Sequence, residues 1–244
     1  MYQDYSAYTE EDHHVWSLLF DKQMNLLPDS ATRAYLDGIR KCGFKRDRVP
    51  RFSEVNKALD QATGWQIYVV PGLIDNKPFF KHLSNREFPA TTWLRSLSQL
   101  HYLEEPDMFH DVFGHIPLLS EQFFCDFLQG ISAITYTYID NPLVVEMMAR
   151  LYWYTVEFGL IRENNTLKIY GAGILSSSGE SLYCLSEVAN HIPYNPQLIM
   201  DTPYIKDKYQ TQYFVVESYK DLFDSLDTVS NIIDQVVETA EPVN

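Results

Sequence analysis

Two histidines separated by five positions, His110 and His115, are the first residues in this sequence whose types and spacing suggest chemistry. On a continuous α-helix that spacing rotates the two side chains about 140° apart, which is too far for one metal ion. Gly114 stands directly before His115, and glycine commonly ends a helix. We therefore expect the helix to end at Gly114 and His115 to fold back beside His110, so that two imidazoles converge on one ion.

A third ligand is available in Glu157, which lies in an aromatic and β-branched run that should be buried. A buried carboxylate is costly unless it is paired, hydrogen-bonded or bound to metal. Glu146 lies nearer the start of the same predicted helix and is expected at the surface. Two histidines and one carboxylate are the ligand set of mononuclear non-haem Fe(II) oxygenases.

Two other interpretations of these three residues stay open. The same ligand types also hold catalytic zinc, although the helical HExxH pattern of many zinc hydrolases is absent. The histidines could instead be hydrogen-bonded residues without a metal.

The elements that must position these residues are mostly helices. Thr9 and Asp12 predict a capping box for a first helix that reaches Leu26. Ser30 is expected to cap a second helix that ends at Cys42–Gly43, and Ser53 a third that ends at Gly64. Further helices are predicted over 120–139, over 142–158 after the Asn141-Pro142 start signal, and around 232–237.

Short strands are predicted at 65–70, 167–170 and 213–216. The helical and extended segments do not alternate as βαβ units, which disfavours a doubly wound sheet. The predicted fold class is therefore mainly α with a few short β-strands.

Composition bounds the remaining functions. The 244 residues carry 19 basic and 33 acidic side chains, a formal charge of −14, which argues against nucleic-acid and anionic-membrane partners. Three widely spaced cysteines, without a CxxC pair, favour a reducing compartment. Neither a signal peptide nor a membrane-spanning apolar run is visible. We expect a cytoplasmic protein.

Three segments, PDMFHDVFGHIPLL, YWYTVEFGLI and YGAGILSSSGE, resemble in this order and separation the catalytic domain of the pterin-dependent aromatic amino-acid hydroxylases. The resemblance runs from about Tyr8 to about Ser218. The segments GWQIYVVPGLIDNKPFFKHLSNREFP and QLHYLEEPDMFHDVFGHIPLL look most like the bacterial phenylalanine 4-hydroxylases. The resemblance implies the catalytic-domain fold of this family.

The implied activity is an iron- and tetrahydropterin-dependent monooxygenase that hydroxylates L-phenylalanine to L-tyrosine with O₂. Tryptophan 5-hydroxylase of the same family is the first alternative, and a zinc-dependent hydrolase using the same triad is the second. The small molecules L-phenylalanine, O₂ and reduced pterin would then be the partners. The resemblance also implies a single catalytic domain over 1–244, without a regulatory domain or a tetramerisation tail, acting as a monomer or dimer.

The resemblance assigns roles to individual residues. The iron ligands match His110, His115 and Glu157. The pterin-binding positions match Gly72, Leu73, Ile74, Phe79, Asp111, Ala149 and Tyr152. The substrate-binding positions match Arg95, Leu103, Pro106, Trp153, Phe158, Gly173 and Ser176.

Several of these assignments carry a specific expectation. Phe79 would stack on the pterin ring, and Arg95 would bind the substrate carboxylate through its planar fork. Glu180 is expected to orient a ligand histidine. Leu103 departs from the animal members, in which threonine is usual. Each assignment has a structural alternative.

These alternatives are structural roles without contact to pterin or substrate. Phe79, Tyr152 and Trp153 could be core aromatics, and Asp111 could be an acid on a helix surface. Arg95 could pair with Glu87 or with Asp107.

Overall fold

A computed structural model describes residues 1–100, 105–206 and 208–240. The α-helices are α1 (Glu10–Met24), α2 (Leu27–Ser30), α3 (Arg33–Lys41), α4 (Phe52–Ala62), α5 (Asn76–Ser84), α6 (Gln122–Thr137), α7 (Pro142–Tyr152), α8 (Ala172–Leu175), α9 (Ser178–Tyr183), α10 (Pro196–Asp201), α11 (Tyr219–Asp224) and α12 (Leu226–Ala240). The strands are β1 (Gln66–Val69), β2 (Glu87–Ala90), β3 (Leu160–Glu163), β4 (Thr166–Ile169), β5 (Asn190–Pro193) and β6 (Gln212–Val216). The predicted fold class, mainly α with a few short strands, is confirmed.

Two π-helical segments interrupt this pattern, η3 (Phe109–His115) and η5 (Trp153–Glu157). Both carry the candidate metal ligands. Short 3₁₀ turns complete the chain at η1 (Tyr5–Ala7), η2 (Leu97–Gln99) and η4 (Ile116–Ser120).

The strands form two small sheets. Strands β1 and β2 pair in parallel, and a four-stranded sheet has the order β4-β3-β6-β5. Its β3–β4 hairpin turns at Asn164 and Asn165, which both have positive φ (51° and 59°), the geometry of a tight type I′ turn. Strand β3 was not predicted from the sequence, although the Asn164-Asn165 pair is a signal for the turn that follows it.

The capping box at the start of α1 is confirmed, because Thr9 and Asp12 bond each other's backbone N–H groups. The predicted second helix differs. Ser30 ends α2, and Thr32 caps α3 by accepting from the N–H of Tyr35. Thr32 is the N-cap in place of Ser30. Its own backbone N–H donates to the carbonyl of Ile169 at 3.0 Å, and this contact with a distant part of the chain fixes Thr32 at the start of the helix.

The predicted cap at Ser53 is also wrong. Helix α4 begins at Phe52, and Arg51 precedes it without a side-chain cap. The Asn141-Pro142 signal is confirmed, since the Asn141 side chain accepts from the first backbone N–H groups of α7. Helix α7 then runs directly into η5, which carries the chain to Glu157.

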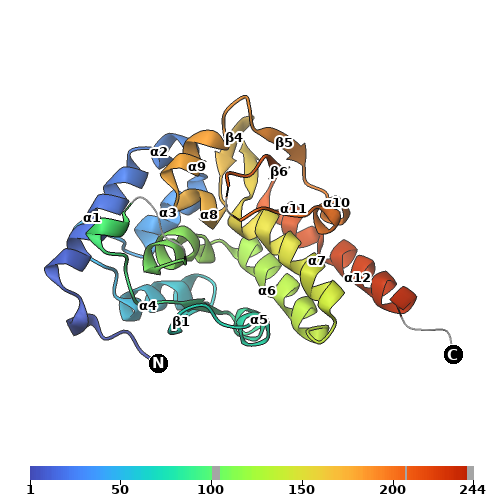
Figure 1. The fold of residues 1–244 in the computed structure, drawn as a ribbon, viewed down its shortest axis with the longest axis horizontal. Coiled ribbons are helices and arrows are strands. Elements are labelled where there is room, and N and C mark those ends of the chain that lie inside the picture. Colours follow the sequence, from blue (N-terminus) through green and yellow to red (C-terminus); the bar gives the residue numbers. More distant parts are fainter. Residues whose placement is uncertain (101–104, 207, 241–244) are drawn as a thin grey trace.

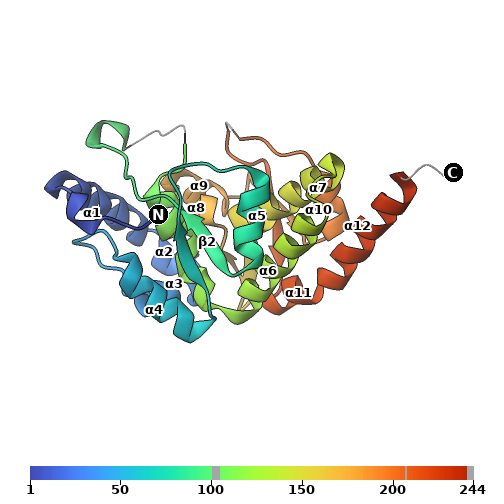
Figure 2. The same cartoon turned by 90° about the horizontal axis from the view of Figure 1, so that it is seen from below.

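Helices α6 and α7 lie side by side in the body of the molecule, and α12 extends away from it in both views (Figures 1 and 2). A cluster of buried aromatic rings packs behind η3. Phe109 stacks on Phe113 with ring centroids 4.6 Å apart, and Trp16 of α1 meets Phe109 edge-on. The hydroxyl of Tyr35 on α3 donates to the carbonyl of Phe113 at 2.8 Å. These contacts hold η3 against α1 and α3.

Within the described ranges, no helix combines the length and the apolar character that crossing a membrane requires.

Candidate active site

The two histidines are brought together by a π-helix. The chain does not end its helix at Gly114, as expected, but continues as η3 through His115. A π-helix bonds each N–H to the carbonyl five residues earlier, so residues five apart lie closer to one face of the helix than they do on an α-helix. The imidazole centroids of His110 and His115 are accordingly 5.1 Å apart, with their planes at 89°. The imidazoles converge, but the predicted cause was wrong.

Gly114 has a different function from the one expected. A Cβ at this position would lie 2.8 Å from the carbonyl oxygen of Ala172 and 3.2 Å from its Cβ. Glycine therefore allows η3 to pack directly against α8. Ser176, which follows α8 directly, contacts His110, so this close approach contributes to the geometry of the ligands.

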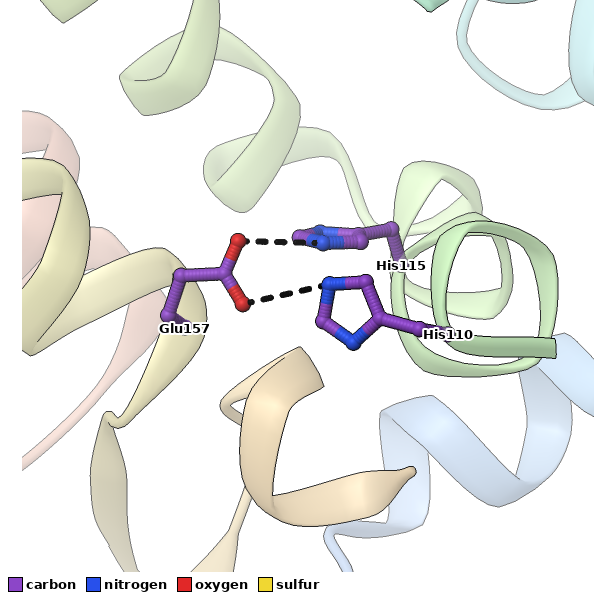
Figure 3. A group of neighbouring side chains, drawn as sticks. All are labelled: His110, His115 and Glu157. Atoms are coloured by element: carbon purple, nitrogen blue, oxygen red, sulfur yellow. Dashed lines mark ion pairs between the residues drawn. The ribbon is translucent and has the colours of Figure 1, made fainter. Parts of the chain in front are cut away.

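Glu157 faces the two histidines from the end of η5 (Figure 3). One carboxylate oxygen lies 3.2 Å from Nε2 of His115 and the other 3.7 Å from Nε2 of His110. All three side chains offer ligand atoms within 4.8 Å of one another. Donors about 2 Å from an ion and at right angles lie about 3 Å apart. The arrangement therefore fits three ligands on one face of a metal ion.

The charges of the three groups suit a cation. Burial raises the pKa of the Glu157 carboxyl, but the neighbouring imidazoles of His115 and His110 outweigh it, so the pKa lies below its usual value. Burial lowers the pKa of His110, more than the attraction of Glu157 raises it. These directions favour an ionised carboxylate and a neutral His110, the forms that bind metal.

Ser176 fixes the ring of His110. Its Oγ lies 2.9 Å from Nδ1 of His110 and donates its own hydrogen to the carbonyl of Ala172 at 2.8 Å. Since that hydrogen is used, Ser176 must accept a hydrogen from Nδ1, and the lone pair of His110 stays on Nε2, toward Glu157. The expectation that Glu180 orients a histidine is wrong, because Glu180 accepts from Tyr213 and from the N–H of Gln210 instead.

A cavity of about 870 Å³ opens at His110 and Glu157, two of the three candidate ligands. Its lining includes His110 and Glu157 and six of the residues expected to bind substrate. These six are Arg95, Pro106, Trp153, Phe158, Gly173 and Ser176. Leu103 lies outside the described residues.

Arg95 is held in the wall of this cavity by Asp107. Nε and Nη2 of Arg95 each donate to one carboxylate oxygen of Asp107 at 2.8 Å, and Asp107 is fully buried. Asp107 also accepts from the N–H of His110 at 3.2 Å. The guanidinium edge expected to bind a ligand is therefore partly occupied, and Nη1 has no partner among the described residues.

A smaller recess of about 80 Å³ adjoins the cavity. Gly72, Leu73, Ile74, Phe79 and Asp111 line it, all five expected at a pterin. Leu73 also lines the larger cavity, so the two spaces are neighbours. Tyr152 does not line the recess but packs edge-on against Phe79, with ring centroids 5.6 Å apart.

Asp111 is a partly buried acid of this recess, not an exposed acid on a helix surface. It accepts from the N–H and the hydroxyl of Thr91 at 2.8 and 3.0 Å. Burial raises its pKa to about 7, in spite of these bonds. Near neutral pH this carboxyl can therefore either donate or accept a hydrogen bond.

The family model of the biopterin-dependent aromatic amino acid hydroxylases matches residues 4–240. The chain belongs to this family.

Bacterial members of the family are similar to this chain over most of its length. The hydroxylase is 46% identical to the phenylalanine-4-hydroxylase of Chromobacterium violaceum over 229 residues, covering 91% of this chain and 75% of that protein. It is 47% identical to the enzyme of the same name from Ralstonia nicotianae, covering 92% and 72%. The crystal structure of the Chromobacterium violaceum enzyme with bound oxidised Fe(III) superposes with a TM-score of 0.93, at 44% identity, covering 99% of this chain and 88% of that one.

Some neighbours of the hydroxylase site were not predicted. Lys22 and Gln23, from the end of α1, line the cavity, and Thr91 holds Asp111. Each contact joins segments at least twenty residues apart, and no local pattern marks such a contact. Ala149 lies one helical turn before Tyr152 on α7 and lines neither space.

Proposed function

We propose that this hydroxylase converts L-phenylalanine to L-tyrosine with O₂, using ferrous iron held by His110, His115 and Glu157 and a tetrahydropterin as reductant. One observation carries the proposal. His110 and Glu157, which lie within reach of a common ion with His115, line a cavity that also presents Arg95 and the aromatic side chains of Trp153 and Phe158.

The cavity suits an amino acid with an apolar ring. The guanidinium of Arg95 is already fixed by Asp107. Binding of the substrate carboxylate therefore costs little further side-chain entropy. Pro106, Trp153 and Phe158 would surround the aromatic ring, and the rings of Trp153 and Phe158 are already packed 4.7 Å apart. The substrate would thus lie with its ring toward Glu157 and the histidines.

The protein's own contribution is to position the reactants and to exclude water. Three protein ligands leave the remaining positions of an octahedral ion free, so a bound ferrous ion can activate O₂ while the pterin supplies two electrons. Ser176 keeps the lone pair of His110 on the metal side.

The adjoining recess is the proposed pterin site. Phe79 offers a ring for stacking, and Tyr152 supports it from behind. The carboxyl of Asp111, anchored by Thr91, would hydrogen-bond the pterin edge. The backbone of Gly72, Leu73 and Ile74 would bond the other polar atoms of the ring.

We also infer a cytoplasmic location from the cysteines. Cys42, Cys125 and Cys184 are buried and free. Free cysteines suit a reducing compartment, and burial, which raises the pKa of each thiol, makes them unreactive. The single catalytic domain and the monomeric or dimeric state stay predictions.

Reconstitution tests the function. The metal-free protein is loaded with ferrous iron or with zinc and assayed for pterin-dependent hydroxylation of phenylalanine and of tryptophan. Tyrosine formed only with iron and pterin supports the proposal. Preferential hydroxylation of tryptophan would make the chain a tryptophan 5-hydroxylase, and pterin-independent hydrolytic activity with zinc would overturn the proposal.

A further inference from the structure

Trp153 is held by more than packing. Its ring stacks on Tyr204, with centroids 4.4 Å apart and planes at 16°, and its indole Nε1 donates to Oε1 of Gln210 at 3.1 Å. Gln210 is 57 positions away in sequence and is only 3% exposed. Packing of the Trp153 ring does not require this hydrogen bond from a buried glutamine, so the bond suggests a role in orienting the ring.

The amide of Gln210 can point in only one direction. Its Nε2 donates to the backbone carbonyl of Ile205 at 2.7 Å. That carbonyl can only accept, and the indole N–H can only donate. Both partners therefore require Oε1 on the side of Trp153.

Glu180 anchors the backbone of the same residue. Its carboxylate, which is 4% exposed, accepts from the N–H of Gln210 at 3.0 Å and from the hydroxyl of Tyr213. Glu180 lies on α9, next to Ser177, Ser178 and Gly179, which line the cavity. The amide is thus fixed at both its backbone and its side chain.

We propose that Gln210 is a positioning residue that holds the indole of Trp153 at the angle at which it receives the substrate ring. The proposal rests on the proposed function for its kinetic test, but not for its spectroscopic test. Gln210 itself is absent from the cavity lining, so it acts through Trp153.

The kinetic test is a double-mutant cycle of Gln210→Leu and Trp153→Phe. Leucine keeps the volume but not the bonds, and phenylalanine keeps a ring but not the N–H. Gln210→Leu is expected to lower kcat/KM for phenylalanine about tenfold, because a buried N–H loses its partner, and to lower the tyrosine formed per pterin oxidised. In the Trp153→Phe background the same change should alter kcat/KM less than twofold. An equal loss in both backgrounds would overturn the proposal.

Conservative and matched variants accompany the cycle. Gln210→Glu keeps an oxygen that accepts from the indole N–H, so its kcat/KM is expected to fall less than that of Gln210→Leu. If this variant folds and loses as much activity as Gln210→Leu, the bond to the indole is not the cause. Gln197→Leu, on the exposed face of α10, is expected to behave as the wild type.

The indole N–H can be observed directly, whatever the substrate. The Trp153 signal is the indole resonance that disappears from the ¹H–¹⁵N spectrum of Trp153→Phe. In Gln210→Leu this resonance should shift, and its exchange with water should be at least about tenfold faster. An unchanged resonance would reject the positioning role, whereas failure of the wild type to form tyrosine would reject only the proposed function.

Discussion

Nδ1 of His110 donates to Oγ of Ser176 across 2.9 Å, and this bond ties a candidate metal ligand in η3 to the residue that ends helix α8. Groups that fix the outer nitrogen of a ligand histidine hold both its tautomer and its orientation. We predict that Ser176→Ala lowers iron affinity about 10- to 100-fold. Titration of the metal-free protein with ferrous iron measures this effect.

Ser178→Ala is the matched control for that variant. Ser178 lines the same cavity, and among the described residues it makes no hydrogen bond to His110, His115 or Glu157. It should bind iron as the wild type does. Equal iron affinity in Ser176→Ala and Ser178→Ala would show that the bond to His110 does not orient the ligand.

The close packing of Gly114 on Ala172 gives a second prediction. A methyl group at residue 114 would lie 2.8 Å from a backbone oxygen, and overpacking of this kind costs about 1–3 kcal/mol. Gly114→Ala is therefore expected to lower the Tm by about 5 °C, since 1 kcal/mol shifts it by about 2–4 °C in a chain of this size. Calorimetry measures the shift.

Gly72→Ala provides the comparison, because a Cβ there would meet nothing within 4 Å. Its Tm should equal that of the wild type. If Gly114→Ala melts at the same temperature as Gly72→Ala, η3 and α8 do not depend on their close contact.

The histidine pair shows which parts of the site the sequence can predict. The candidate ligands His110, His115 and Glu157 are visible from residue type and burial pattern alone. The π-helix that aligns them is not, because it depends on the contact of Gly114 with Ala172, 58 positions later.

The same distinction applies to the fold. Caps whose partners are local, such as Thr9 with Asp12, are predicted correctly. The choice of Thr32 over Ser30 depends on Ile169 in β4, and no local signal carries that information.

Glu180 gives a prediction on pH. Burial raises its pKa above the usual 4.5, more than the bonds from Tyr213 and Gln210 lower it. Between 4.5 and the raised value, the folded protein binds more protons than the unfolded chain does. This group therefore makes stability fall as pH rises through that interval.

Glu180→Gln removes this titration and keeps an acceptor for Tyr213. Urea unfolding at a series of pH values above 4.5 should show a smaller decline in the free energy of unfolding than in the wild type. Parallel curves for the two proteins would contradict a raised pKa at Glu180.

The recess next to Asp111 gives a prediction on the pterin. Phe79→Ala removes the proposed stacking surface, and loss of aromatic stacking costs about 0.5–1.5 kcal/mol in addition to the buried area that is lost. We expect the KM for the pterin to rise about tenfold and the KM for phenylalanine to change little. Phe123→Ala, a partly exposed ring on α6, serves as the control. A larger rise in the KM for phenylalanine than in the KM for the pterin would contradict the assignment of the recess to the pterin.

Tyrosine formation as a function of iron bound tests the central claim most directly. The metal-free protein is titrated with ferrous iron in the presence of phenylalanine, O₂ and tetrahydropterin, beside Glu157→Ala as a parallel sample. We predict that activity rises in proportion to bound iron, reaches its plateau at one ion per chain, and is absent from the variant. Full activity without iron, or undiminished activity in Glu157→Ala, would contradict the account.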